Sequence, residues 1–338
     1  MARNVDKSQL DRAKKNKNDE FYTQRVDIDR ELQHYPESFR GKTVYCNTDD
    51  PRHSHFFKYF YDNFEDLGLA RLIATGYAND GQKHGTYFSY TGAASERKAY
   101  ESGQISYLKG DGDFRSPECV RLLKEADVVV TNPPFSLLRD FVALLRWHSK
   151  DFLIIATINA ITYKDIFAEI QSGNIWLGVG LGRAISGFIV PEHYELYGSE
   201  ARINDQGERI VATNSSLWLT TLDLDRRHAE IALVCKYAQH ETKYPMYDNL
   251  EAIEVGRTRD IPADWHGLMG VPITFLHKHN PKQFQIVRFR KGDDGRDLRI
   301  DGKCPYFRIV IRRADIQRSP EMESPSITRS GQDALFLL

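Results

Sequence analysis

The sequence predicts an α/β protein: a doubly wound, mostly parallel sheet followed by a smaller α+β region. Short apolar runs alternate with amphipathic helical stretches between about residues 19 and 225, which is typical of strands that alternate with helices. Beyond residue 226, Tyr, Pro, His and Arg are interspersed with short apolar runs such as Ile309–Ile311. A chain of 338 residues can bury a sizeable core in each of two lobes.

The elements of the first region follow from its apolar pattern. Strands are predicted over residues 43–46, 72–75, 105–108, 126–130 and 152–156. Helices are predicted over residues 53–66, 117–125 and 136–148, and the first of them places its phenylalanines on one face. The glycine-rich residues 81–103 predict a hairpin-like connection. The alternating run 216–222 completes the predicted sheet.

Three polar loops follow three of the predicted strands. They comprise residues 47–51, 110–114 and 132–135. Ligands of doubly wound sheets bind at the carboxyl ends of the strands. The three loops are therefore expected to converge at one edge and to form the functional site.

The loop Asn132-Pro133-Pro134-Phe135 carries the strongest chemical signal. An amino group on an aromatic ring, such as N6 of adenine, is a poor nucleophile because its lone pair is delocalised. The Asn132 side-chain carbonyl and a backbone carbonyl, that of Pro133, can accept its two N–H bonds as preorganised acceptors. Pro133 and Pro134 stiffen the turn, and Phe135 offers a face on which a base can stack. This chemistry needs no metal; the alternative is an ordinary strand running into a turn.

Positive charge is concentrated at the two ends of a chain whose formal net charge is only −1. Residues 1–18 contain six Lys or Arg against two Asp, and residues 277–318 contain twelve against five. Such clusters fit contacts with phosphates, although solvated surface charge explains either cluster equally simply. The candidate DNA-binding residues are Arg12, Lys14, Lys15 and Lys17 in the first cluster and Arg288, Arg290 and Lys291 in the second.

Two further features bear on location. The four cysteines, Cys46, Cys119, Cys235 and Cys304, are scattered without metal-ligand spacing, so we expect free thiols in a reducing cytoplasm. No apolar run approaches the roughly 20 residues needed to span a bilayer, and the N-terminus has no apolar signal core.

Four motifs in a fixed order carry a family resemblance: Asp19–Thr23, Tyr45–Pro51, Gly110–Phe114 and Asn132–Phe135. They resemble the EcoRI-type adenine-N6 DNA methyltransferases, which use S-adenosylmethionine, and the resemblance extends over about residues 1–313. It implies a site-specific enzyme of a restriction–modification system that flips its target adenine out of double-stranded DNA. A short palindrome such as GAATTC is the kind of target implied. No obligate protein partner is implied, and a monomer is expected.

The resemblance also implies which residues hold the methyl donor. They are Phe21, Tyr22 and Thr23 of the first motif, Asn47, Asp49 and Asp50 of the second, and Asp111, Asp113 and Phe114 of the third. Such enzymes place an acidic residue after the second strand for the ribose hydroxyls. This chain has Ala74-Thr75-Gly76-Tyr77 there, so the ribose contact is unassigned.

The predicted organisation has four parts. A basic N-terminal arm (1–18) precedes an S-adenosylmethionine-binding catalytic domain (19–225), a DNA-recognition domain (226–313) and a disordered tail (314–338). Two alternatives remain open at this stage. One is an enzyme that methylates an RNA base or a protein glutamine; the other is a catalytically dead nucleic-acid-binding protein, which the intact third and fourth motifs disfavour.

Overall fold

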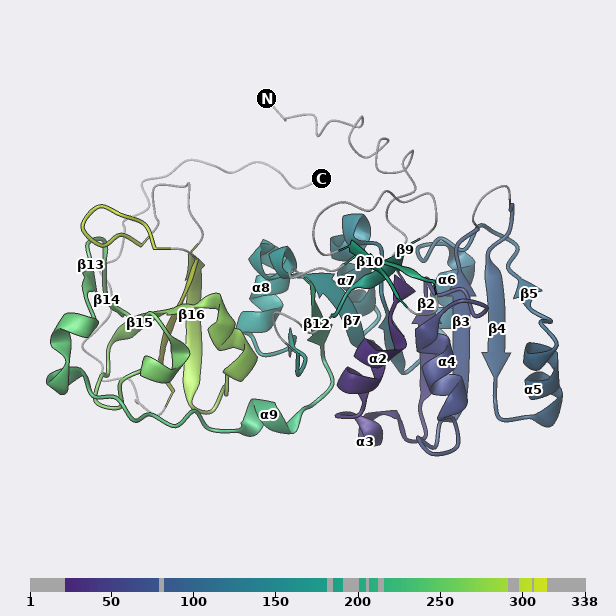
Figure 1. The fold of residues 1–338 in the computed structure, drawn as a ribbon, viewed down its shortest axis with the longest axis horizontal. Helices are drawn as coiled ribbons and strands as arrows, with labels where there is room; N and C mark the ends of the chain where they lie inside the picture. Colours follow the sequence, from purple (N-terminus) through teal and green to yellow (C-terminus); the bar gives the residue numbers. More distant parts are fainter. Residues whose placement is uncertain are drawn as a thin grey trace, which may run out of the picture.

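In the computed structural model of the chain, the described residues form three sheets, and the two larger ones lie side by side along the longest axis of the molecule (Figure 1). The structure describes residues 22–78, 82–180, 185–190, 201–204, 207–211, 216–290, 298–305 and 307–314. The predicted basic arm and residues 315–338 of the predicted tail lie outside the described residues.

An eight-stranded mixed sheet forms the larger part of the molecule, in the order β5-β4-β3-β2-β6-β7-β12-β8. The four central strands, β3, β2, β6 and β7, are parallel. Each flanking strand is antiparallel to its inner neighbour. The strands are β2 (Thr43–Asn47), β3 (Arg71–Gly76), β4 (Thr86–Tyr90), β5 (Ser106–Tyr107), β6 (Val128–Thr131), β7 (Asp151–Thr157), β8 (Trp176–Leu177) and β12 (Ser216–Thr220).

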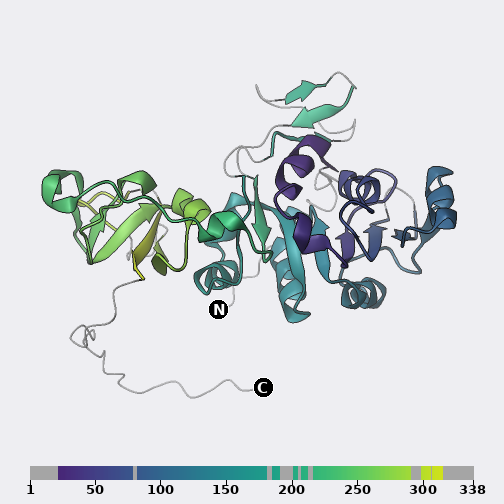
Figure 2. The ribbon, with the colours of Figure 1, turned by 90° about the horizontal axis from the view of Figure 1, so that it is seen from below.

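Helices cover both faces of this sheet (Figures 1 and 2). One face packs against α2 (Arg25–Leu32), α3 (Pro36–Phe39) and α4 (His55–Asp62). The other face packs against α6 (Pro117–Glu125), α7 (Leu138–Trp147) and α8 (Lys164–Gln171). Along β6, Val128 and Val130 belong to the hydrophobic cluster on the side of α2, α3 and α4, whereas Val129 belongs to the cluster on the side of α6, α7 and α8. Burial on both faces is why these strands read as continuous apolar runs.

The prediction for residues 81–108 is wrong in two respects. The glycine-rich stretch holds a strand, β4, and a helix, α5 (Ala94–Glu101). Its glycines mark turns at the two ends of that helix, since Gly92 and Gly103 have φ of 88° and 75°. The predicted third strand is the two-residue edge strand β5, antiparallel to β4 and exposed, rather than a buried parallel strand.

Two predicted helices have different bounds in the structure. The helix expected over residues 53–66 begins at His55, because Ser54 Oγ accepts a hydrogen bond from Phe57 N at 3.1 Å, and it ends at Asp62. The helix expected over residues 136–148 is a 3₁₀ turn, η1 (Phe135–Leu137), followed by α7.

A small four-stranded sheet, which the sequence did not predict, has the order β1-β9-β11-β10. Its strands are β1 (Tyr22–Thr23), β9 (Phe188–Val190), β10 (Ala201–Ile203) and β11 (Arg209–Val211). β10 and β11 stand away from the main body (Figure 2), whereas β1 and β9 lie against it.

The third sheet belongs to the C-terminal region and has the order β13-β14-β15-β17-β16. Its strands are β13 (Met246–Tyr247), β14 (Leu250–Glu254), β15 (Leu268–Pro272), β16 (Phe284–Arg290) and β17 (Arg308–Arg313). Between residues 229 and 314, the described helices are all 3₁₀ turns, namely η3 (Tyr237–Gln239), η4 (Glu241–Lys243), η5 (Thr258–Asp260) and η6 (Ile273–Lys278). The predicted α+β region is thus a sheet with short turns in the described residues.

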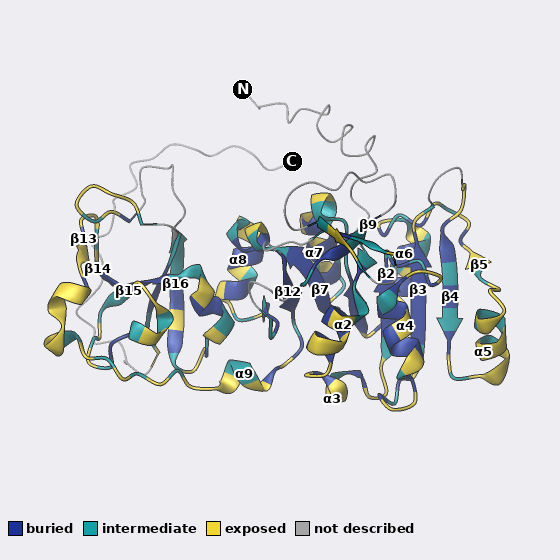
Figure 3. Cartoon of the chain, in the orientation of Figure 1, coloured by how far each residue is buried: buried dark blue, intermediate teal, exposed yellow. Residues whose placement is uncertain are grey.

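The two large sheets share one hydrophobic cluster. Phe167 on α8 packs against Phe289 on β16, with ring centroids 5.3 Å apart. Gln171 Nε2 donates to the carbonyls of Ile286 and Val287 at 3.2 and 2.7 Å. Figure 3 shows buried residues running through both sheets. The connecting helix α9 (Asp225–His228) spans the predicted boundary at residue 225.

The four cysteines are free thiols, with Cys46 and Cys119 buried. Among the described residues, no helix has the length and apolar character needed to cross a membrane.

Candidate active site

The loops after β2 and β6 meet at the carboxyl edge of the large sheet. Thr48 turns back with a φ of 69°, which is uncommon for a residue with a side chain. Its Oγ1 lies 3.1 Å from Thr131 Oγ1 and 3.5 Å from the Asn132 carbonyl. The structure therefore brings together the second and fourth sequence motifs.

Asp49 lies between these two loops and is almost completely buried. One carboxyl oxygen accepts from Ser54 Oγ at 2.7 Å, and the other contacts Thr131 Oγ1. Burial, with a smaller effect from the charge of Asp50, raises the pKa of this carboxyl to about 7. Asp50 itself pairs with the guanidinium of Arg52.

The predicted third loop reaches the same edge although the strand before it is not a parallel one. Ala78 N donates to the Asp111 carbonyl at 2.7 Å, which pins the loop beside the end of β3. Gly76 fits only as glycine: an added Cβ would lie 2.5 Å from Thr86 Oγ1 and 2.8 Å from Asp50 Cα. The expected convergence of three loops is confirmed, and close backbone packing produces it.

The side chains of the third loop that were assigned to the methyl donor, those of Asp111, Asp113 and Phe114, differ in exposure. Asp111 is exposed, and its Oδ1 accepts from Asp113 N at 3.0 Å. Asp113 pairs with Arg115 at 2.7 Å. Phe114 is buried against Phe141, with ring centroids 5.1 Å apart, so it belongs to the core beneath the loop.

The first motif joins the edge through β1. His55 Nδ1, at the start of α4, lies 2.8 Å from the Thr23 carbonyl. β1 pairs with β9, with Thr23 opposite Phe188. Tyr22 is half-buried in the same strand, and Phe21 lies outside the described residues.

Phe135 is half-buried at the start of η1. It packs edge-on against Phe188 of β9, with ring centroids 5.9 Å apart. Pro133 is buried and Pro134 half-buried. The loop is thus held by β9 on one side and by Thr48 on the other.

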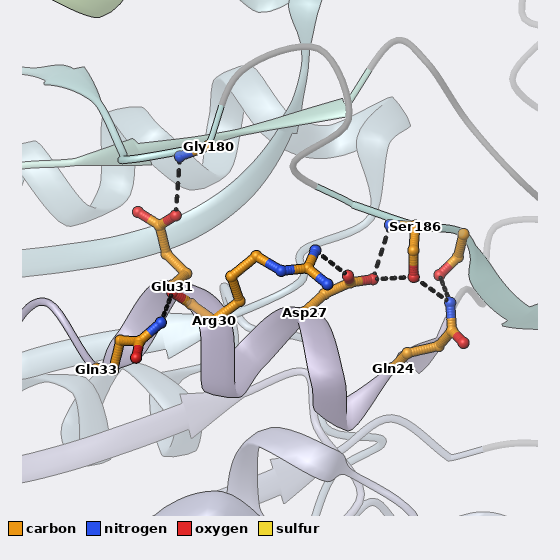
Figure 4. Close-up of polar contacts among 8 residues, drawn as sticks. Gln24, Asp27, Arg30, Glu31, Gln33, Gly180 and Ser186 are labelled. Carbon is orange, nitrogen blue, oxygen red and sulfur yellow. Dashed lines mark hydrogen bonds and ion pairs between the residues drawn. The ribbon is translucent and has the colours of Figure 1, made fainter.

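Helix α2 anchors the chain that leads into β9 (Figure 4). Asp27 accepts from both the backbone N and Oγ of Ser186 at 2.8 Å. Glu31 accepts from the backbone N of Val179 and Gly180 at 2.7 and 3.1 Å. Both carboxyls are buried, which raises their pKa. Two carboxylates one helical turn apart therefore fix the approach to Phe188.

The candidate DNA-binding residues do not all lie in the described part of the chain. Arg288 is half-buried on the edge strand β16, beside α8. Arg290 ends the same strand, where its backbone pairs with Arg308. Lys291 and the arm residues Arg12, Lys14, Lys15 and Lys17 lie outside the described residues.

Sequence reasoning missed the hydroxyl groups that join the loops: Thr48, Ser54 and Thr131. In sequence, Thr131 looks like an ordinary strand residue. A left-handed backbone is predicted from sequence where Gly or Asn stands, so the threonine at position 48 gave no sign of it. A serine before an amphipathic run was a readable sign of the helix start at Ser54.

Comparisons with known proteins agree on one family. The family model described as "Adenine-specific methyltransferase EcoRI" matches residues 9–314. The Type II methyltransferase M.EcoRI of Escherichia coli is 54% identical over 326 residues, covering 94% of this chain and 100% of that protein. M.MgeORF184P of Mycoplasma genitalium and M.MpnI of Mycoplasma pneumoniae, both Type II methyltransferases, are each 35% identical over 91% and 90% of this chain and 99% and 98% of their own. No solved structure matches the chain.

The protein is therefore an adenine-specific DNA methyltransferase of the Type II restriction–modification class. Within that class, the chain belongs to the EcoRI family of adenine-specific methyltransferases. The family resemblance seen in the sequence is confirmed. Such an enzyme acts on DNA and requires a methyl donor.

Proposed function

We propose that the chain transfers the methyl group of S-adenosylmethionine to N6 of an adenine flipped out of double-stranded DNA. The observation that carries this proposal is the contact of Thr48 with Thr131 and Asn132, at 3.1 and 3.5 Å. It puts the loop assigned to the methyl donor beside the loop assigned to the amino group. Holding both reactants in one geometry supplies much of the catalysis in such transfers. We also propose that the large sheet is the doubly wound sheet of this enzyme class.

The polar groups behind this edge fit a bound donor. Thr23 Oγ1 and Asn47 Nδ2 are among the buried side-chain atoms of the described residues that have no hydrogen-bond partner, and a bound ligand or water is one explanation for such an atom. Both belong to motifs assigned to the donor. The donor would be surrounded by six residues of these motifs: Tyr22, Thr23, Asn47, Asp50, Asp111 and Asp113. Asp49 and Phe114 would support the loops from behind, and Phe21 directly precedes Tyr22 in sequence. When bound, S-adenosylmethionine supplies an electrophilic methyl group.

The residues 132–135 would hold the adenine. The Asn132 side-chain carbonyl and the Pro133 carbonyl accept the two N–H bonds of the amino group, which favours the pyramidal nitrogen of the transition state. Phe135, steadied by Phe188, provides the stacking face. Pro134 restricts the turn between them.

The function is tested by methyl transfer from radiolabelled S-adenosylmethionine. Label should appear as N6-methyladenine in a DNA duplex containing GAATTC. 2-Aminopurine placed at each adenine position in turn should become brighter at the flipped position. Transfer to RNA of the same sequence or to protein glutamine, with none to DNA, would refute the proposal.

The free thiols favour a cytoplasmic location.

The carboxyl of Asp111 is proposed to accept from the adenine amino group of the donor. Asp111→Ala should weaken S-adenosylmethionine binding about tenfold, since a lost hydrogen bond to a charged group costs roughly 1.5 kcal/mol or more. DNA affinity should not change. Calorimetry measures both constants, and Asp66→Ala, an exposed aspartate after α4, is the matched control. An unchanged donor affinity would move the role to Asp113.

The C-terminal sheet is proposed as the DNA-recognition domain, with the basic arm as a second phosphate contact. Replacing Arg288, Arg290 and Lys291 by Ala should weaken DNA binding and flatten its salt dependence by up to about three units of slope, since each phosphate contact contributes roughly 0.9. Donor affinity should stay unchanged. The control replaces three exposed lysines on α4, α5 and α6, namely Lys58, Lys98 and Lys124. A wild-type slope in the first variant would shift the role to Arg12–Lys17.

A further inference from the structure

A buried carboxyl and its neighbouring hydroxyls join the two loops of the proposed site. Thr131 Oγ1 contacts both the Asn47 carbonyl and Asp49 Oδ2, and Asp49 Oδ1 accepts from Ser54. Asn47, Asp49, Ser54 and Thr131 are all buried. Water is therefore a poor substitute for any of these contacts.

The count of hydrogens in this group is informative. Thr131 has one hydroxyl hydrogen, yet its oxygen faces two acceptors, the Asn47 carbonyl and the Asp49 carboxyl. With an ionised Asp49, one of these contacts would join two oxygens with no hydrogen between them. A protonated Asp49 can donate to Thr131, which then donates to Asn47, while Oδ1 of Asp49 still accepts from Ser54.

The surroundings of Asp49 shift its carboxyl toward the neutral acid. Burial, the largest effect, raises the pKa of this carboxyl to about 7, the hydrogen bonds with Thr131 and Ser54 act against that shift, and the negative charge of Asp50 adds to it. The buried thiol of Cys46 also interacts with Asp49, whose charge contributes to raising the pKa of that thiol. No cation is among the groups that shift the Asp49 carboxyl in the described part of the chain.

We propose that Asp49, Thr131 and Thr48 form one positioning network for Asn132, in which Asp49 acts as a hydrogen donor. Thr131 directly precedes Asn132, and Thr48 Oγ1 lies 3.1 Å from Thr131 Oγ1 and 3.5 Å from the Asn132 carbonyl. Thr48 has one hydroxyl hydrogen, so it donates to one of these two oxygens at a time. Rotation of the Asn132 peptide would separate its carbonyl from Thr48. The network rests on the proposed function, because it matters for catalysis only if Asn132 holds the amino group.

The test compares variants that keep or remove a hydrogen donor. At about pH 6, on the acidic side of the Asp49 pKa of about 7, Thr131→Val and Asp49→Ala should slow single-turnover methyl transfer at least about tenfold, the cost of roughly one lost hydrogen bond. Thr131→Ser and Asp49→Asn should stay within about threefold of wild type, since Ser keeps the hydroxyl and the Asn amide keeps a donor and an acceptor. Donor and DNA affinities should change less than the rate.

Thr220→Val is the matched control. Thr220 is buried, and its hydroxyl donates to the Phe152 carbonyl at 2.8 Å at the opposite edge of the sheet. This variant should lose stability comparably to Thr131→Val yet methylate at the wild-type rate.

Three outcomes would overturn the network. A wild-type rate in Thr131→Val would show that the hydroxyl does not position Asn132. Asp49→Asn as slow as Asp49→Ala would show that the ionised carboxylate is required. Additive losses in the Asp49→Ala/Thr131→Val double variant would show independent residues rather than one unit. A wild-type enzyme that fails to methylate DNA would instead refute the proposed function.

Discussion

Asn132→Ala is expected to lower the single-turnover methylation rate by about 10²–10³-fold while leaving donor and DNA affinities within a few-fold. Loss of one preorganised transition-state acceptor costs roughly 2.7–4 kcal/mol in comparable sites. On the proposed assignment, the side-chain carbonyl of Asn132 is needed only while the amino nitrogen pyramidalises, so the loss should fall on the rate rather than on binding. Rapid quenching with radiolabelled donor measures the rate, and calorimetry measures the affinities.

The control for this variant is Asn174→Ala, the same substitution in an exposed turn after α8. It should keep the wild-type rate. If Asn132→Ala also methylates at a near wild-type rate, the amino group is held by another residue and the assignment of the fourth motif to catalysis fails.

Arg308→Met is expected to lower the free energy of unfolding by about 3–5 kcal/mol. The guanidinium of Arg308 contacts the Glu254 carboxylate at 2.6 and 2.9 Å, and their side chains are only 14% and 10% exposed. Removal of the cation would leave the buried Glu254 carboxylate without its counter-ion. A buried charge without a counter-ion is strongly destabilising. Urea denaturation followed by fluorescence measures the change.

Two variants make the Arg308 prediction specific. Arg312→Met on the same strand loses a hydrogen bond to Gln285 near the surface and should cost less than about 1 kcal/mol. The double variant Glu254→Gln/Arg308→Met removes the stranded charge and should recover most of the loss. If the double variant is no more stable than Arg308→Met, the cost comes from lost packing rather than from the buried charge.

The central strands could be predicted because burial on both faces leaves a continuous apolar record in sequence. Val128–Val130 is buried throughout, and its strand was predicted within two residues. The edge strand β5 was mispredicted because Ile105 and Leu108 suggested burial while Ser106 and Tyr107 lie exposed. A strand this short exists only through its pairing with β4, which no local pattern reveals.

The proposed site divides in the same way. The loop at Asn132 could be proposed from the sequence because the chemistry needs particular residue types in a row, and its catalytic role stays a prediction. The contact between Asp49 and Thr131 joins residues 82 positions apart, so it depends on the packing of β2 beside β6. The anchoring of β9 by Asp27 and Glu31 was equally unreadable, since both look like ordinary surface acids in sequence.

The hydrophobic cluster that passes from α8 into the third sheet has a consequence for where the methyl group goes. On the proposed assignment, the bases that are read and the base that is modified contact two sheets that share one hydrophobic core, in which Phe167 packs directly against Phe289. Packed interiors yield little to small loads. The distance along the duplex between the bases that are recognised and the adenine that is methylated is then fixed. The fold therefore determines which adenine within the target sequence is methylated.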